Sequence, residues 1–473
     1  MKRPSLWIAC VPLVFLVALI ACVVGVFGDE TLSGASQISL LSATAVCLML
    51  GLACCKLSWA DFEQVVRSRV GDVSVALLIL LLIGGLAGSW MVGGIVPTFI
   101  YYGMELVSPK WFLVTSCVIC AIVSVMTGSS WTTIATIGVV LMGIGTALGL
   151  HVGWTAGAII SGAYFGDKVS PLSDTTVLAS SVVGTPLFTH IRYMMFTTVP
   201  TFTITLLIFT FKGFGMDEAD MSQVLEVQHA LSSTFCISPW FFIVPLLTLA
   251  MIMRRMPSVA VLFFSVLMGC AAMLIAQGHL LDQIADDASL VERRFRAVLI
   301  AIYGSTNLHT GSDVLDDLVS TSGMAGMMDT IWLIICATIF GAAMTATGMI
   351  ETIVYHMQRL VRGTVSLVAS TAFTGIFLNI TCADQFLSII LSSHMFQKMY
   401  QEGGYESRLE SRTVEDSATV TSVLIPWNTC GMTQSRVLGV STFLYAPYCI
   451  FCYLSPLMSI LMAAIGFHIY RKE

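Results

Sequence analysis

Long apolar runs alternate with short polar intervals along most of this chain. The first run covers residues 6–27 and the second about 33–55, and each is long enough for the roughly 20-residue helix that crosses a bilayer. The run at 73–107 exceeds one crossing and has glycines in its middle, so it predicts either one long tilted helix or two short pieces. Further runs occupy residues 111–126, 134–150, 154–164, 188–211, 240–253, 259–276, 331–347, 365–380, 386–399, 418–426 and 444–469. The pattern predicts an all-α protein that crosses a membrane many times.

The composition supports a membrane protein and argues against several other classes. Of 473 residues 56% are hydrophobic and only 11% are charged, which is more apolar surface than a soluble core can bury. The formal net charge of −6 gives no basic footprint for a nucleic-acid partner. The 14 cysteines lie mostly in apolar runs, where we expect free thiols, and the scattered histidines lack zinc-site spacing. Because no nucleophile with a matched base is visible, we expect neither an enzyme nor a cofactor.

Basic residues flank the apolar runs unevenly. Under the positive-inside rule, loops rich in Lys and Arg face the cytoplasm. The rule places both termini, a loop at residues 56–70 and the turn between residues 253 and 259 in the cytoplasm, which requires an even number of crossings. Asp29 and Asp217 fall in predicted water-exposed loops, and residues 291–303 read as an amphipathic helix in the membrane interface. The basic residues concerned are Lys2, Arg3, Lys56, Arg67, Arg69, Arg254, Arg255, Arg471 and Lys472.

Four polar intervals interrupt the apolar runs, at residues 127–133, 167–176, 381–385 and 425–433. Ionisable groups at membrane depth are costly and are by default functional candidates. Pro171 should also interrupt any helix in the second interval. Interrupted helices inside membranes leave backbone carbonyls free to bind cations. The alternative is that these intervals are solvated surface loops between spans.

The chain contains a weak internal repeat that keeps its register. Gly94, Thr98, Tyr101, Leu106 and Val107 recur as Gly348, Thr352, Tyr355, Leu360 and Val361 at an offset of 254 (348 − 94). When the offset is increased by one residue to 255 (426 − 171), Pro171 corresponds to Pro426. Secondary transporters commonly pair two inverted repeats and bind their substrates where broken helices of both halves meet. We therefore predict N-terminal helices at 1–71, a first repeat at 72–211, connecting helices and a loop at 212–325, and a second repeat at 326–473.

The oxygen-bearing side chains in and near the four intervals are the candidate site. Hard cations such as Na⁺ prefer oxygen ligands, and a carboxylate can also carry a proton. We assign Na⁺ coordination to Asp174, Asp384 and Asn428, and proton exchange to Asp384 and Asp174, which lie at breaks in opposite halves. The full set of candidate ion- or substrate-binding residues is Asp167, Ser170, Ser173, Asp174, Thr175, Thr176, Ser129, Ser130, Thr381, Asp384, Gln385, Glu415, Asp416, Asn428 and Thr429.

Some of these residues also have structural explanations. Lys168 is adjacent to Asp167 and would neutralise it, since buried charges are usually paired. Glu415 and Asp416 follow residues 401–412, which look solvated, and would cap a helix that starts near Ser417. Both alternatives remain open from the sequence alone.

Three motifs resemble a known family. The sequences FGDKVSPLSDTTVLAS (165–180), TCADQ (381–385) and EDSATVTSVLIPWNTCG (415–431) are similar to the NhaC family of sodium/proton antiporters. The resemblance implies inverted repeats with re-entrant hairpins, a scaffold and a moving transport domain, and a homodimer. It also implies exchange of Na⁺ for H⁺ across a bacterial-type inner membrane, with lipid as the surroundings and no cofactor.

The same resemblance leaves a second activity open. The family includes members that resemble malate/lactate antiporters coupled to Na⁺ and H⁺. The alternative is therefore an exchanger of a small organic anion or amino acid, in which Arg192 or Lys168 would bind a carboxylate.

Overall fold

The computed structural model describes residues 4–27, 34–55, 57–106, 108–215, 221–254, 256–285, 289–306, 308, 316 and 319–471. Within these ranges, nine helices are long and apolar enough to cross a membrane, or eleven spans if each of two bent helix pairs counts as one. The predicted all-α polytopic fold is confirmed. The predictions made for Lys2, Arg3, Asp29, Lys56, Asp217, Arg255 and Lys472 fall outside the described residues.

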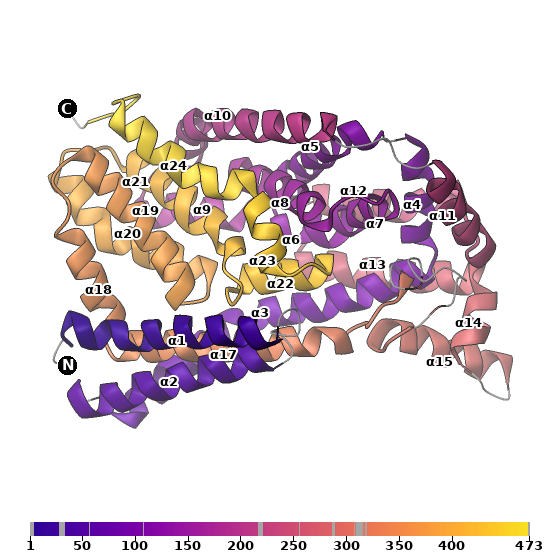
Figure 1. Ribbon diagram of the computed structural model, residues 1–473, viewed down its shortest axis with the longest axis horizontal. Helices are drawn as coiled ribbons and strands as arrows, with labels where there is room; N and C mark the ends of the chain where they lie inside the picture. The colour runs from indigo at the N-terminus through magenta and orange to yellow at the C-terminus, as the bar shows by residue number, and fades with distance from the viewer. Residues whose placement is uncertain are drawn as a thin grey trace.

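Four long helices form one layer of the molecule. Helices α1 (Leu6–Phe27), α2 (Ala35–Cys54), α3 (Trp59–Val92) and α17 (Met328–Ala346) pack side by side along the lower edge of Figure 1. A turn at Gly93 and Gly94 separates α3 from α4 (Ile95–Leu106), so the apolar run at 73–107 is two pieces. Helix α18 (Met349–Gln358) follows α17 after a matching turn.

The prediction of a loop at residues 56–70 is wrong, because α3 begins at Trp59 and continues through the segment, whereas its cytoplasmic side stays a prediction. The charged residues that suggested a loop are spaced for a helix. Arg67 pairs with Glu63 four residues earlier, and Arg69 lies 3.9 Å from Asp72 three residues later. Such pairs stabilise a helical surface.

A second group of helices follows α9 in the chain. It comprises α10 (Leu187–Phe214), α11 (Met221–Thr234), η3 (Pro239–Phe242), α12 (Ile243–Met253), α13 (Ser258–Ala276), α14 (Gly278–Ile284) and α15 (Leu290–Tyr303). Helices α13 and α15 pack against α3, and α10 packs against α5 and α24. The predicted helix at residues 291–303 is present as α15, and its position relative to a membrane interface stays a prediction.

The remaining helices are interrupted. In the first half they are α5 (Pro109–Thr127), α6 (Ser130–Thr133), η2 (Ile134–Gly138), α7 (Val139–Ala147), α8 (Val152–Val169) and α9 (Asp174–Val183). In the second half they are α19 (Thr364–Thr381), α20 (Gln385–Glu402), α21 (Ser407–Val414), η5 (Glu415–Thr419), η6 (Ser422–Leu424), α22 (Thr429–Leu438), α23 (Thr442–Tyr445), η7 (Ala446–Tyr448) and α24 (Ile450–Ala464). The breaks at residues 128–129, 170–173, 382–384 and 425–428 fall within the four polar intervals.

Several breaks and turns of the two halves recur at one offset in the chain. Helices α9 and α22 are both 10 residues long and start 255 residues apart (429 − 174). Left-handed backbone recurs at the same offset, since Gly149 and Gly404 (404 − 149 = 255) and Gly184 and Gly439 (439 − 184 = 255) all have positive φ. The offset found in the sequence therefore also relates the turns and breaks of the structure.

Helices α5 and α8 approach unusually closely. A Cβ atom at Gly162 of α8 would lie 2.0 Å from the carbonyl oxygen of Cys117 in α5, and one at Gly166 would lie 2.4 Å from that of Ala121. Only glycine allows this contact, because any side chain would push the helices apart. The close contact aligns the ends of the two helices, so their breaks lie next to each other.

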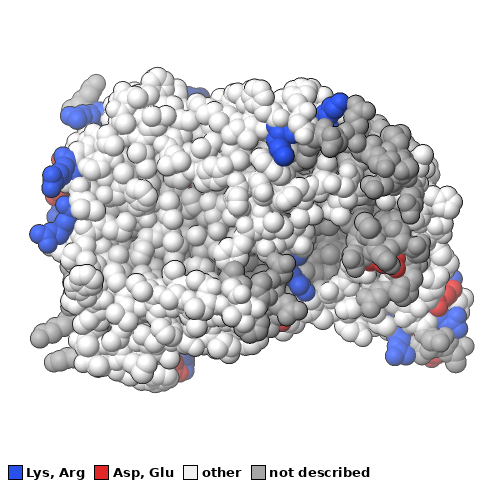
Figure 2. All heavy atoms as spheres, viewed as in Figure 1, with Lys and Arg blue, Asp and Glu red and all other residues white. Residues whose placement is uncertain are grey.

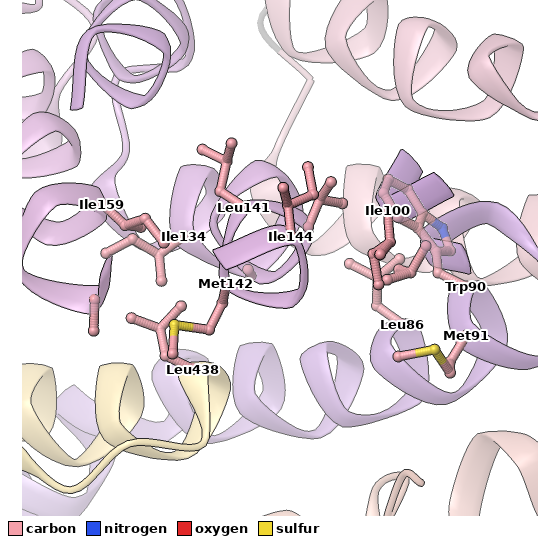
Figure 3. Close-up of a cluster of buried hydrophobic side chains, with 14 of the residues drawn as sticks. Leu86, Trp90, Met91, Ile100, Ile134, Leu141, Met142, Ile144, Ile159 and Leu438 are labelled. Atoms are coloured by element: carbon pink, nitrogen blue, oxygen red, sulfur yellow. The ribbon is translucent and has the colours of Figure 1, made fainter. Parts of the chain in front are cut away.

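Apolar packing joins the interrupted helices to the long helices. Figure 3 shows Leu86 and Trp90 of α3 near Ile100 of α4, with Ile144 of α7 facing them. Trp90 also donates a hydrogen bond from its indole nitrogen to the carbonyl of Ser265 in α13, 3.1 Å away. All 14 cysteines are free thiols, as the sequence predicted.

The surface has the charge distribution of a membrane protein. On the face in Figure 2, most of the surface over α1, α10 and α24 is uncharged, and Lys and Arg side chains lie at the left edge, at the lower right and at a few places between. Apolar side chains of α10 and α24, such as Phe188, Phe211 and Leu461, are exposed at the surface. A surface of this kind fits contact with lipid. Figure 1 shows both chain ends at the same end of the molecule.

Candidate functional site

The two breaks of the first half are joined by side-chain hydrogen bonds. Ser130, which follows the break after α5, donates to Oδ2 of Asp167 at 2.6 Å. Ser170, in the break after α8, donates to the carbonyl of Val125 at 2.8 Å. The Ser129 hydroxyl accepts from the Thr132 amide at 3.2 Å and caps α6. These bonds fix Asp167, only 6% exposed, at the junction of the breaks.

The second half joins its breaks through amides. Asn379 of α19 donates to the carbonyl of Ala418 at 2.7 Å, and Asn428 donates to the carbonyl of Asn379 at 3.1 Å. The backbone amide of Thr429 donates to the carbonyl of Ala383 at 2.9 Å. Asn379 was missed in the sequence, although an amide within an apolar helix is a signal that a buried polar contact exists.

A cavity of about 380 Å³ lies where the breaks of both halves meet α3. The first half lines it with Asp167, Asp174 and Thr175, the second with Asp384 and Thr429. Carboxylate and hydroxyl oxygens of this kind fit a small hard cation. The sequence-predicted residues that line it are Ser129, Asp167, Asp174, Thr175, Asp384, Gln385 and Thr429. The long helix α3 contributes Asp72, which the sequence did not single out.

A smaller cavity of about 20 Å³ adjoins Asp384 on its α3 side. Arg69 and Asp72 of α3 line it together with Asp384 and Cys382. Neither Arg69 nor Asp72 was predicted as a site residue, because the segment was assigned to a loop. The helical spacing of the charged pairs in that segment was the signal available in the sequence.

Asp384 and Asp174 both stand at helix N-termini. Asp384 is the N-cap of α20, and its Oδ1 accepts from the amide of Leu387 at 2.9 Å. Its other oxygen accepts from the Thr429 hydroxyl at 3.4 Å. Asp174 is the first residue of α9 and is exposed to the cavity. Both predicted ligands therefore face one space, from opposite halves.

Asn428, the third predicted Na⁺ ligand, is placed differently. Its side chain is fully buried, its oxygen accepts from the amide of Cys430 at 3.0 Å, and its nitrogen donates to Asn379. It is not among the residues that line the cavity. Thr176 and Thr381 likewise donate to backbone carbonyls, those of Lys168 at 2.9 Å and Phe377 at 3.0 Å.

A chain of hydroxyl groups connects Asp167 to Glu415. Ser173 donates to Oδ1 of Asp167 at 2.6 Å, and its oxygen lies 2.9 Å from the hydroxyl of Thr175. Thr175 donates to Oε1 of Glu415 at 3.3 Å. Glu415 is completely buried, and within the described residues its Oε2 has no hydrogen-bond partner.

The expectation that Lys168 neutralises Asp167 is wrong. Lys168 instead forms an ion pair with Asp416 of η5 and donates to Ser455 of α24 at 2.9 Å. Asp416 also accepts from Thr197 of α10 at 3.2 Å, and Arg412 lies 4.0 Å from its second oxygen. The hydroxyls of Ser130 and Ser173 donate to the two oxygens of Asp167. Lys168 therefore pairs with Asp416 of η5 and not with the aspartate beside it in the chain.

The prediction that residues 401–412 are solvated is also wrong for 407–412. Helix α21 covers Ser407–Val414, and Glu410 and Arg412 are buried within it. Glu415 and Asp416 do not cap a new helix at Ser417, because they continue α21 as the π-helical turn η5. The charge of Asp416 is buried with two cations beside it, since Lys168 and Arg412 face it from two sides.

Comparison with known proteins matches this chain to one family and to several antiporters. Residues 162–467 match the Na⁺/H⁺ antiporter family. The chain is 36% identical to the Na⁺/H⁺ antiporter NhaC of Alkalihalophilus pseudofirmus, over 88% of each chain. It is 33% identical to the malate-2H⁺/Na⁺-lactate antiporter of Bacillus subtilis, over 87% of this chain and 85% of that one. It is 30% identical to the arginine/ornithine antiporter ArcD of Halobacterium salinarum, over 100% of this chain and 94% of that one.

Proposed function

Because this chain belongs to the Na⁺/H⁺ antiporter family, we propose that it is a secondary active transporter that exchanges Na⁺ for H⁺ across the membrane. The main structural support is the cavity in which Asp167 and Asp174 of one half meet Asp384 of the other. Irregular backbone at membrane depth survives only when it is buried in protein or lines a watery space, and here the breaks at 128–129 and 382–384 line the cavity.

The chemistry of exchange follows from the carboxylates. An ionised carboxylate accepts a cation, whereas a protonated one presents a hydroxyl and has lost its charge. Na⁺ and H⁺ therefore compete for Asp174 and Asp384, assisted by the hydroxyls of Thr175 and Thr429. Na⁺ is the transported ion in this scheme, and the residues need no cofactor to perform the exchange.

Exchange of an organic anion or amino acid is the second candidate, supported by the malate/lactate and arginine/ornithine antiporters among the relatives. The residues first considered for carboxylate binding do not favour it. Lys168 is buried in its pair with Asp416, and Arg192 lies exposed on α10, outside the cavity lining. The cation and proton scheme uses the residues that do line the cavity.

Purified protein in proteoliposomes tests the two candidates. With a preset pH gradient, external Na⁺ should collapse the gradient, while choline at equal ionic strength should not. Uptake of radiolabelled malate, lactate or arginine that requires the protein, without any Na⁺-driven proton flux, would replace the first candidate with the second. Protein carrying Asp384→Asn provides the matched negative control.

We further infer that residues 72–211 and 326–473 are inverted repeats in a homodimer of a bacterial-type inner membrane, with both termini in the cytoplasm. The recurring offset of breaks and turns supports the repeats, and the shared position of the chain ends supports a common side. Single cysteines placed at Arg254 and Arg471 in a cysteine-free background should react with a membrane-impermeant reagent only after the cells are opened. Reaction in intact cells would reverse the orientation.

A further inference from the structure

The four residues Asp167, Ser173, Thr175 and Glu415 form a continuous line of oxygen atoms, which we call the hydroxyl relay. It contains three contacts, of 2.6, 2.9 and 3.3 Å, between a carboxylate at each end and two hydroxyls in the middle. Each hydrogen bond requires one hydrogen, and two hydroxyls supply only two. The relay is therefore complete only when one of the two carboxyl groups contributes the third hydrogen.

The two ends of the relay have different access to the site. Asp167 lines the cavity, whereas Glu415 does not line it and is completely buried. The remaining oxygen of Asp167 accepts from Ser130, while the remaining oxygen of Glu415 has no partner among the described residues. A buried, unsatisfied carboxylate oxygen is costly when charged, and the cost is much smaller when the group is neutral.

We propose that Asp167 and Glu415 form one proton-binding dyad that shares a single proton through Ser173 and Thr175, and that only Asp167 presents its charge to the cation cavity. The dyad adds a second proton position, away from the cation, to the site described above. Its role in transport rests on the proposed Na⁺/H⁺ exchange, whereas the shared proton itself does not depend on which ion is carried.

Transfer along the relay conserves every atom and charge. Glu415 gives its proton to the Thr175 oxygen, Thr175 passes its own hydroxyl hydrogen to Ser173, and Ser173 passes its hydrogen to Oδ1 of Asp167. Both hydroxyls are neutral before and after. The negative charge moves from Asp167 to Glu415, so the cavity loses one of the carboxylate charges that attract the cation. The reverse transfer returns the proton to Glu415 and restores that carboxylate. The proton exchanges with cavity water only while it is on Asp167, because Asp167 lines the cavity and Glu415 does not.

Other charged groups surround the dyad and must be kept constant in any test. Helices α19 and α24, which also pack against η5, contain no Asp, Glu, Lys, Arg or His. The groups on the remaining neighbours are Lys168 on α8, Asp174 on α9, His190, Arg192 and Lys212 on α10, Asp384 at the start of α20 with His394, Lys398 and Glu402 along it, Arg408, Glu410 and Arg412 on α21, and Asp416 on η5. A change confined to Thr175 alters none of these charges.

The test compares Thr175→Val, which removes the hydroxyl at nearly constant shape, with Thr175→Ser, which keeps it. Thr201→Val is the matched control, because Thr201 is also buried but only donates to the carbonyl of Thr197 within α10, at 2.8 Å. The first readout is the rate of Na⁺-driven proton exchange in proteoliposomes as a function of pH. We expect Thr175→Val to slow exchange about tenfold and to change the shape of the pH profile, and Thr175→Ser and Thr201→Val to resemble the unmodified protein.

The second readout is the carboxylic C=O band in infrared difference spectra of the purified full-length protein after a pH step. Glu415→Gln should remove one such band while Na⁺ binding persists, because the amide nitrogen donates to Thr175 as a protonated carboxyl would. Asp167→Asn should instead abolish Na⁺ binding. A band that is unchanged by Glu415→Gln, or a Thr175→Val pH profile equal to that of the unmodified protein, would overturn the dyad.

The outcomes separate the dyad from the proposed function. If the unmodified protein fails to exchange Na⁺ for H⁺ but Glu415→Gln still removes a carboxyl band, the exchange function is wrong and the dyad stands. If exchange is normal and the band persists in Glu415→Gln, the function stands and the dyad is wrong.

Discussion

Lys168 of α8 and Asp416 of η5 form an ion pair in which both side chains are completely buried. The pair joins elements from the two halves of the chain, next to the residues at both ends of the hydroxyl relay. Removing one member of a buried pair leaves an uncompensated charge, which typically costs about 3–5 kcal/mol, whereas replacing both by apolar groups is often neutral.

We therefore expect Lys168→Met to lower the thermal unfolding temperature of the detergent-purified protein strongly. The double variant Lys168→Met with Asp416→Leu should recover most of the loss. Lys398→Met is the control, since Lys398 pairs with Glu402 on an exposed surface and such pairs contribute little. If the double variant unfolds at a lower temperature than Lys168→Met alone, the loss of stability in Lys168→Met does not come from leaving the charge of Asp416 unpaired.

The second prediction concerns Asp384, which lines both cavities. Asp384→Asn should abolish Na⁺/H⁺ exchange at every pH while the protein remains folded. The amide still accepts from the Leu387 amide as an N-cap, but it cannot bind and release a proton. Asp174→Asn should weaken cation affinity or abolish exchange. Proteoliposome exchange assays decide the matter, with the exposed Asp61→Asn of α3 as control. Normal pH-dependent exchange by Asp384→Asn would leave Asp167 and Glu415 as the proton-carrying groups.

The third prediction concerns Arg69, which shares the small cavity with Asp72 and Asp384. A guanidinium near these carboxylates competes electrostatically with a bound cation. We expect Arg69→Gln to raise apparent Na⁺ affinity roughly threefold to tenfold, and Asp72→Asn to lower it. Affinity is measured as the Na⁺ concentration for half-maximal exchange at constant ionic strength. Arg67→Gln should have no effect, because Arg67 is 78% exposed and paired with Glu63. If Arg69→Gln and Arg67→Gln have the same apparent Na⁺ affinity, Arg69 does not influence cation binding at this site.

The sequence predicted the breaks better than it predicted the charged partners. Pro171 and the polar residues around it contradict a continuous membrane helix locally, so the break can be recognised without knowing what it contacts. The partner of Lys168 is a different matter. Asp416 lies 248 residues away in the chain, and no local pattern indicates that they meet.

Charge alone also misled the assignment of two segments. Residues 56–70 and 401–412 contain many charged residues, which normally indicates a solvated loop. In α3 the charges lie on a helix that extends beyond the apolar run, and in α21 Arg412 is buried because it faces Asp416 and packs over the ring of Tyr193 at 4.5 Å. Burial of such groups depends on tertiary partners, which a single sequence does not show.

The last prediction uses two positions that the repeat makes equivalent, Gly128 and Ala383 (383 − 128 = 255). Both have left-handed backbone, with φ of 67° and 56°, at the first break of each half. For a residue with a side chain this conformation costs roughly 1–2 kcal/mol, so Ala383 stores strain that Gly128 avoids.

Ala383→Gly should therefore raise the unfolding temperature or leave it unchanged. Gly128→Ala should lower it by more than the conformational cost alone, because the new Cβ would lie 2.6 Å from the carbonyl carbon of Leu172 in the adjoining break. Thermal unfolding and exchange assays of both variants measure the effects. If Ala383→Gly destabilises the protein as much as Gly128→Ala does, the two break positions do not have equivalent backbone requirements, contrary to what the repeat implies. Ala383→Gly therefore reports the conformational cost alone, whereas Gly128→Ala adds to that cost the close contact with Leu172, which belongs to the first half.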